Sequence, residues 1–359
     1  MRRRRVVQQA GLAGILAACA APAVHAQPVV RWRLATAFHA TLDAIHGGTE
    51  QFARQVGLLS GGRLQVTLLP NEEPIPHLAQ LEALQQGEID ALHAVPSYFV
   101  GLDECFAFDS AIPFGLNSRQ MNAWQLEGNG LRLLRDFYAP HQIVNFPMGN
   151  SGAQMGGWFR RELHSAGDLQ GLRMQIDGLG ARVLQALGGS PQQMAMGELV
   201  GALERGALDA VEWVGPHDDR KLGLGRVARH YYYPGWWEGG SQLSLYCNLK
   251  AWRALAPELK AVVEAAAQCV HATIQARYDL LNPVALKQLV AAGAKVKAFP
   301  LPVMDAAFKA SSALHAELSR RNPNWRRIHA DFSAFRREQN LWHRLAEASF
   351  DRYMQSARL

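Results

Sequence analysis

Hydrophobic residues along the chain follow two spacings, every second position and every third or fourth, which predict strands and helices in turn. The first series of predicted elements is a strand at Val30 to Thr36, a helix at 43–58, a strand at Leu64 to Leu68, a helix at 77–86 and a strand at Ile89 to Ala94. Glycine-containing segments end both helices. This β-α-β-α-β order is typical of a parallel sheet covered by helices.

The same order recurs later in the chain. The second series is a strand at Leu172 to Ile176, a helix at Gly180 to Leu187, a strand at Gln192 to Met196, a helix at 198–205 and a strand at Ala207 to Trp213. Residues 83–91 and 202–210 even match in sequence at the helix end, the glycine and the start of the strand. Because glycine ends helices generally, this match supports two similar lobes without proving a duplication.

Beyond Trp213 the pattern changes. An aromatic and glycine-rich cluster at 231–240 comes first, followed by a predicted strand at Gln242 to Asn248. A long helical stretch then begins near Leu249, with a second start at Pro257 and an interruption at Pro283. The segment from Val303 to Leu359 is predicted to be mostly helical, with a break at 322–324. Such a chain can cross between two lobes more than once, which suits hinged closure around a ligand.

The length of 359 residues exceeds one ordinary core and suits two lobes. We expect residues 1–26 to be an export signal. The first lobe is expected to contain 27–150 plus about 241–280, and the second 151–240 plus about 281–359, including the C-terminal helices.

The N-terminal segment has the three parts of an export signal. Four arginines at 2–5 precede an apolar stretch from Gly11 to Ala21, and Val24-His25-Ala26 forms a small-x-small cleavage site. The paired arginines also allow the twin-arginine route. An alternative is a lipoprotein box ending at Cys19, which would tether the protein. No apolar stretch is long enough to span a bilayer, so we expect an exported, periplasmic protein.

Composition narrows the functional classes. The apolar content of 48% and the charged content of 19% disfavour disorder. Most of the net charge of +6 comes from the four arginines of the export signal, and the remaining charges nearly balance. A nucleic-acid-binding protein usually carries a larger basic excess, so this class is disfavoured.

Three cysteines remain after the export signal: Cys105, Cys247 and Cys269. Their odd number and wide spacing predict neither a disulfide framework nor a zinc site. Cys269 lies in a helical pattern and is expected to be a buried small hydrophobic residue. An oxidising compartment would allow a Cys105–Cys247 bridge, although spacing alone cannot establish it.

The chain lacks the phosphate-binding loop, the H-E-x-x-H motif and the C-x-x-C motif of common enzyme classes. The Gly223-Leu224-Gly225 segment follows no predicted strand, so it does not indicate a dinucleotide site. His217, Asp218 and Asp219 could bind a metal. The favoured interpretation of these three residues is a solvated helix start.

Three segments carry candidate binding chemistry. Glu212 and Trp213 lie at the C-terminal end of a predicted strand, where α/β sheets collect ligands, but Glu212 could instead cap the next helix while Trp213 packs. The amides and glycines of 150–158 could supply oxygen ligands or form an ordinary turn before a strand. The aromatic residues of 231–238 could line a pocket or form a core between lobes, with Glu238 as a further oxygen ligand.

Together these segments resemble the solute-binding proteins of TRAP transporters, closest to the branch that binds 2-oxo acids and related small monocarboxylates. The matching stretches are Ile112 to Leu116, Met121 to Trp124, Gly149 to Phe159, Glu212 to Pro216 and Tyr231 to Glu238. The resemblance implies a two-lobed α/β fold like that of periplasmic binding proteins, with a long connecting helix and a helical C-terminus. It also implies that the protein delivers its ligand to membrane permease subunits.

In this branch the ligand carboxylate can rest on a bound cation, which the resemblance places on four residues here. The implied cation ligands are the Gln154 side chain, the Glu212 carboxylate, the Trp213 backbone carbonyl and Glu238. Sodium or calcium suits such oxygen ligands. The implied substrate contacts are Phe38, Tyr98, Asn150, Gln154, Gln175 and Trp213.

One position departs from the family pattern, which typically has an arginine that pairs with the substrate carboxylate. Gln175 stands there, and an amide lacks the charged, bidentate fork of arginine. Arg173 lies two residues away, on the same strand face, and could substitute. Asp177 adds an acid where the family often has proline. Either the cation holds the carboxylate alone, or the ligand is less anionic than usual.

The favoured function is therefore binding of a small 2-oxo or 2-hydroxy acid without chemistry. The rivals are a secreted metal-dependent hydrolase with Glu212 as base beside His217, and a sensor that docks the loaded protein on a receptor. The long C-terminal helices allow a homodimer.

Overall fold

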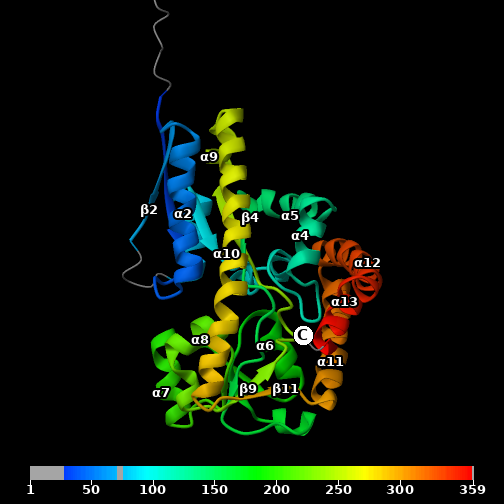
Figure 1. Cartoon of the computed structure of the whole chain (residues 1–359). Helices are drawn as coiled ribbons and strands as arrows, with labels where there is room; N and C mark the ends of the chain where they lie inside the picture. The colour runs from blue at the N-terminus through cyan, green and yellow to red at the C-terminus, as the bar shows by residue number, and fades with distance from the viewer. Residues whose placement is uncertain (1–27, 71–75, 358–359) are drawn as a thin grey trace, which may run out of the picture.

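The computed structural model describes residues 28–70 and 76–357, and the expected export signal, including Cys19, lies outside them. Two sheets form the cores of two lobes. The first has the order β2-β1-β3-β10-β4, and the second β11-β9-β5-β8-β6-β7. Helices cover both sheets, and the single helix α10 extends along the two lobes (Figure 1). The expected α/β, two-lobed architecture is confirmed.

Three strands of the first sheet are parallel, as the β-α-β-α-β pattern predicts. The strands of this sheet are β1 (Val30–Thr36), β2 (Leu64–Leu68), β3 (Ala91–Ala94), β4 (Ile143–Asn150) and β10 (Gln242–Asn248). Strand β10 pairs antiparallel with both β3 and β4, so the chain returns to the first lobe after building most of the second.

The second sheet mixes parallel and antiparallel pairs. Its strands are β5 (Trp158–Phe159), β6 (Arg173–Gln175), β7 (Ser190–Gln192), β8 (Ala210–Val211), β9 (His230–Tyr233) and β11 (Lys295–Ala298). The strand predicted at 192–196 is wrong in its bounds, because β7 ends where that prediction starts. The strand predicted at 207–213 shortens to β8, because the chain leaves the sheet at Glu212.

The helices follow the predicted periodicity closely in the first lobe and at the C-terminus. Their bounds are α2 (Asp43–Leu59), α3 (His77–Gln86), α4 (Ser118–Leu126), α5 (Gly130–Tyr138), α6 (Gly178–Ala186), α7 (Leu199–Glu204), α8 (Pro216–Leu222), α9 (Leu249–Ala254), α10 (Pro257–Ala291), α11 (Leu301–Arg321), α12 (Pro323–Leu345) and α13 (Glu347–Ser356). None of the helices among the described residues is long and apolar enough to cross a membrane.

The repeated sequence at 83–91 and 202–210 has a structural counterpart. In each lobe an aspartate at the end of the repeat accepts hydrogen bonds from the backbone N–H and the Nε of an arginine on the neighbouring strand. The pairs are Asp90 with Arg33, and Asp209 with Arg173. Arg173 is thereby paired with Asp209 and does not line the pocket, which disfavours the alternative that it replaces the arginine of the family pattern.

Helix α10 has 35 residues and continues through Pro283, so the interruption predicted there is wrong. It packs against α2 and β4 of the first lobe and against α8 of the second. An interior proline removes one helical hydrogen bond, and packing along the helix offsets that loss. Tyr278, before the proline, donates a hydrogen bond to Asp218 in α8 (2.8 Å).

The cysteine expectations are also corrected. Cys105, Cys247 and Cys269 are all free thiols, so the Cys105–Cys247 bridge does not form. Cys269 is exposed rather than buried. Its sulfur accepts a hydrogen bond from the Gln55 side chain of α2 (3.2 Å).

The contact between α2 and α10 depends on a glycine. A Cβ on Gly48 would lie 2.5 Å from Ile274 Cδ1 and 2.7 Å from Ile274 Cγ1, whereas a Cβ on Gly57 of the same helix would meet nothing within 4 Å. We expect Gly48→Ala to lower the free energy of unfolding by about 1–3 kcal/mol through overpacking. Gly57→Ala, the matched control, should raise it by about 0.5–1 kcal/mol.

Urea titration of both variants measures this difference. Equal effects of the two substitutions would contradict a close-packed contact at Gly48.

Candidate functional site

A pocket opens between the two lobes where strands of both sheets end. Its lining comprises Phe38, Leu42, Ile45, Val95, Ser97, Tyr98, Ser151, Gln154, Gln175, Asp177, Glu212, Trp213, Val214, Glu238, Ser241 and Leu243. Several of these residues follow the carboxyl ends of β1, β3, β6 and β8, the edge where α/β sheets bind ligands. The cavity has a volume of about 80 Å³.

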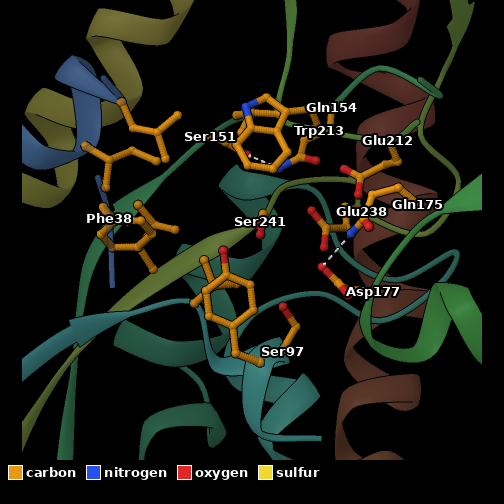
Figure 2. A pocket seen from close by; sticks show the side chains of 16 residues that line it. Phe38, Ser97, Ser151, Gln154, Gln175, Asp177, Glu212, Trp213, Glu238 and Ser241 are labelled. Atoms are coloured by element: carbon orange, nitrogen blue, oxygen red, sulfur yellow. Dashed lines mark hydrogen bonds between the residues drawn. The ribbon is translucent and has the colours of Figure 1, made fainter. Parts of the chain in front are cut away.

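Backbone hydrogen bonds bring the polar side of the pocket together from distant segments. The N–H of Glu212 donates to the carbonyl of Gln175 (2.9 Å), which places Glu212 beside β6. The N–H of Gly235 donates to the carbonyl of Gln154 (2.9 Å), which brings the Gln154 segment to the one carrying Glu238. Figure 2 shows Gln175, Glu212 and Glu238 converging on the cavity with Asp177 beside them.

Gly157 permits one of these close approaches. Its φ of +86° favours glycine, and a Cβ there would lie 2.6 Å from the carbonyl oxygen of Val211. Strand β5 can therefore lie directly against β8, where Trp158 pairs with Val211. This pairing fixes the backbone immediately before Glu212.

Two buried polar atoms in the lining have no hydrogen-bond partner among the described residues. One is the acceptor Gln154 Oε1 and the other is the donor Trp213 Nε1. Gln154 uses its Nε2 to donate to Ser151 Oγ (3.0 Å), which leaves the amide oxygen for the cavity. Buried polar groups normally have partners. The acceptor Gln154 Oε1 therefore suits a bound cation, and the donor Trp213 Nε1 suits a hydrogen-bond acceptor on a ligand.

Three carboxylates concentrate negative charge in the pocket. Burial, then the charges of Glu238 and Asp177, raise the pKa of Glu212 well above its ordinary value. Burial raises the pKa of Glu238 to about 7, with the charge of Asp177 adding to the effect. Burial also raises the pKa of Asp177. No lysine, arginine or histidine occurs in the lining, so the described protein supplies no counter-charge there.

These residues fit a hard cation. Carboxylate and amide oxygens are the ligands that sodium and calcium use, and the free Gln154 Oε1 joins Glu212 and Glu238 in the same cavity. A cation held there would offset the mutual repulsion of the carboxylates. The alternative in which Glu212 caps the next helix is excluded, because the N-cap residue of α8 is Gly215, and the first-turn N–H of His217 donates to Asn282 Oδ1 (3.0 Å).

Most of the residues implied by the resemblance line the pocket: Phe38, Tyr98, Gln154, Gln175, Glu212, Trp213 and Glu238. Asn150 is not part of the lining. It is fully buried, and its Oδ1 accepts a hydrogen bond from Gly152 N (2.9 Å), while its Nδ2 has no described partner. A contact between Asn150 and a ligand stays a prediction.

Four of the five aromatic residues at 231–237 form cores rather than a pocket wall, and the fifth, Tyr233, is exposed. Tyr231 stacks on Trp158 with ring centroids 3.9 Å apart, and Trp236 and Trp237 are buried in the neighbouring cluster. Only Glu238 of this segment reaches the pocket.

The polar pocket residues that the sequence did not single out are Ser97 and Ser241, and the apolar ones are Leu42, Ile45, Val95 and Leu243. Ser97 follows β3 by three residues, so the rule about strand ends could have found it.

A second polar cluster connects the lobes outside the pocket. Asp43, His217 and Asp218 place possible metal-ligating atoms within 4.8 Å of one another. However, Lys221 Nζ lies 2.6 Å from Asp43 Oδ1 and 3.0 Å from Asp218 Oδ1, so an ammonium group already neutralises the cluster.

Because α2 belongs to the first lobe and α8 to the second, this cluster is an ion-pair contact between lobes. Asp218 and Asp219 are each only 1% exposed, so the predicted solvated helix start is wrong.

Comparison with known proteins identifies the fold. Residues 35–322 match the family model described as bacterial extracellular solute-binding protein, family 7. A monocarboxylate 2-oxoacid-binding periplasmic protein of Nostoc sp. is 39% identical over 330 residues, covering 92% of this chain and 90% of the relative.

Two solved structures of TRAP solute-binding proteins are also similar. One, from Bordetella bronchiseptica RB50, is 42% identical with a TM-score of 0.88, and the match covers 92% of this chain and 98% of the Bordetella chain. That structure is a mixed-occupancy dimer with copurified calcium and picolinate. The other, from Pseudoalteromonas atlantica T6c, is 31% identical with a TM-score of 0.86, covers 92% and 100%, and holds sodium and pyruvate.

The interlobe pocket and the two-sheet fold are those of a binding protein that holds a ligand between lobes. The chain belongs to the bacterial extracellular solute-binding proteins of family 7 and is a TRAP-type solute-binding protein. The predicted family is confirmed.

The crowding of carboxylates leads to a test in the absence of any cation. In a sodium-free buffer with a chelator at pH 8, Glu212→Gln should raise the free energy of unfolding by an amount on the order of 1 kcal/mol, because it removes an acid whose pKa folding raises, and such an acid destabilises the folded state at a pH above its ordinary pKa. Glu204→Gln, at the exposed end of α7, is the matched control and should have little effect. Thermal unfolding measures both, and a clear loss of stability in Glu212→Gln would contradict the repulsion.

Proposed function

We propose that this protein captures a small 2-oxo or 2-hydroxy carboxylate with the help of a bound sodium or calcium ion and delivers it to TRAP membrane permease subunits. One observation carries the proposal. Gln154 Oε1, which has no hydrogen-bond partner among the described residues, lines the same pocket as Glu212 and Glu238, and that lining contains no cationic side chain. An anionic ligand cannot enter such a pocket at low free-energy cost unless a cation accompanies it.

The roles of the lining residues follow from their chemistry. Gln154, Glu212, Glu238 and the Trp213 backbone carbonyl hold the cation, which supplies a positive charge to the ligand carboxylate. The Trp213 Nε1–H, which has no described partner, donates to an anionic oxygen of the ligand. Phe38 and Tyr98 close the pocket from the first lobe, and Gln175 contributes a neutral amide from the second.

We infer that the protein performs no chemistry on its ligand. A metal-dependent hydrolase with Glu212 as base would need His217 nearby. His217 Nε2 instead contacts Asp43 Oδ1 (2.9 Å), and the pocket lining contains neither histidine nor cysteine. A transport function also requires an exported protein, in agreement with the export signal predicted at residues 1–26.

The division into lobes is part of the same proposal. The first lobe is residues 27–150 plus about 241–280, and the second 151–240 plus about 281–359 with the C-terminal helices. The pocket lies between the two sheets of these parts, and the contact of Asp43 with His217 and Lys221 joins them on one side. Closure of the lobes then encloses the ligand.

Calorimetry with pyruvate and calcium tests the cation's role. Pyruvate should bind the calcium-loaded protein and lose at least about thirtyfold in affinity when a chelator removes calcium, because loss of a buried charge partner costs about 2–5 kcal/mol. Glu212→Gln should lose affinity for both calcium and pyruvate, while Glu204→Gln binds normally. Undiminished pyruvate binding in the chelator and a sodium-free buffer would overturn the cation bridge.

We also propose a homodimer through the C-terminal helices. An exposed apolar face, here called the C-terminal apolar face, comprises Leu341, Trp342, Leu345, Phe350, Tyr353 and Met354. Large exposed apolar surfaces usually mark an interaction site. The dimeric relative from Bordetella bronchiseptica supports a second copy of this chain as the occupant.

Light scattering after gel filtration tests this interface. Leu345→Glu should convert a dimer to a monomer. Leu58→Glu on α2 is the matched control, because Leu345 and Leu58 are 73% and 80% exposed, and it should leave the dimer intact. A wild-type protein that is monomeric at high concentration would overturn this interface.

A further inference from the structure

Asp177 is the one pocket carboxylate that has no place among the proposed cation ligands. It occupies the N-cap position of α6 with extended backbone angles, φ −111° and ψ 177°. An aspartate at an N-cap usually accepts a hydrogen bond from the first turn of the helix. Here the side chain makes no such bond and lines the pocket instead.

The hydrogen bonds that Asp177 does form leave acceptor capacity unused. Its Oδ1 accepts from Gln193 Nε2 at 2.9 Å, and its Oδ2 accepts from Gln175 Nε2 at a long 3.5 Å. A carboxylate offers about four acceptor positions. Among the salt bridges of the described residues none includes Asp177, so no positive side chain neutralises it.

Gln175 is fixed so that its donor side faces Asp177. Its Oε1 accepts a hydrogen bond from Met194 N (2.8 Å), which orients the Nε2 toward the aspartate (Figure 2). The amide can donate a neutral hydrogen bond but cannot balance a charge. The two residues therefore give this end of the pocket a net negative, acceptor-rich surface.

We propose that Asp177 selects ligands that carry a hydrogen-bond donor, an ammonium or a hydroxyl group, in addition to the carboxylate. The inference rests on the proposed function, because the cation must already hold the carboxylate.

The charges of the pocket favour this arrangement. A divalent cation balances Glu212 and Glu238, which leaves Asp177 and the ligand carboxylate as two uncompensated negative charges in a small cavity. A ligand ending in a methyl group would desolvate Asp177 without replacing its lost hydrogen bonds, which is costly for a charged group. A hydroxyl group would restore a hydrogen bond, and an ammonium group would also neutralise the charge.

Three ligands with one chelating group and different ends isolate this effect. Lactate, glycerate and isoserine (3-amino-2-hydroxypropanoate) all carry a 2-hydroxycarboxylate, and end in a methyl, a hydroxymethyl and an aminomethyl group. In calorimetry with saturating calcium, glycerate or isoserine should bind at least about tenfold more tightly than lactate, a difference of about 1.4 kcal/mol. If glycerate binds more tightly than isoserine, Asp177 selects a neutral donor, and if isoserine binds more tightly, it selects a cationic donor.

Variants connect this preference to Asp177. Asp177→Ala should abolish the gain of glycerate and isoserine over lactate while keeping or improving lactate affinity, and Asp177→Asn should remove mainly the gain of isoserine. Asp351→Ala, at an exposed position on α13, is the matched control and should keep the wild-type order. Retained lactate binding also shows that the variant is folded.

The outcomes separate this inference from the proposed function. If pyruvate and lactate bind with calcium but the donor-bearing ligands gain nothing, or if the gain survives in Asp177→Ala, the role of Asp177 is overturned while the proposed function stands. If neither pyruvate nor any of the three ligands binds with calcium, the proposed function fails, and this inference fails with it.

Discussion

The concentration of negative charge in a confined pocket is the constraint on which the site depends. Glu212, Glu238 and Asp177 lie together in a cavity without a cationic side chain, and their burial raises the pKa of each. Protein interiors tolerate such charges poorly unless something compensates them. The site therefore favours a bound cation, whose positive charge would compensate these carboxylates.

The fold holds these groups in place through interactions that span both lobes. Helix α10 packs against α2 and β4 on one side and α8 on the other, and the cluster of Asp43, His217 and Lys221 adds an ion-pair contact between α2 and α8. Such contacts fix the position of one lobe relative to the other in this structure.

Much of the site was predictable because its residues lie in short, distinctive segments. Glu212 and Trp213 follow a strand, and that position alone indicated a ligand-binding edge. The family resemblance added Gln154 and Glu238. Patterns could not separate Glu238 from the aromatic residues before it, since all of them suit a pocket wall. Only packing shows that Tyr231, Trp236 and Trp237 belong to cores.

The sequence by itself determined the alternating α/β architecture, most element bounds in the first lobe and the residue types of the pocket, because these depend on local periodicity and on motifs. Tertiary structure decided what depends on distant partners. Packing along α10 overrides the helix-breaking tendency of Pro283. Arg173 forms an ion pair with Asp209. The ammonium group of Lys221 forms ion pairs with Asp43 and Asp218, two of the residues that could otherwise bind a metal. Spacing along a chain cannot reveal which partner a charged side chain finds, because that partner lies tens or hundreds of residues away.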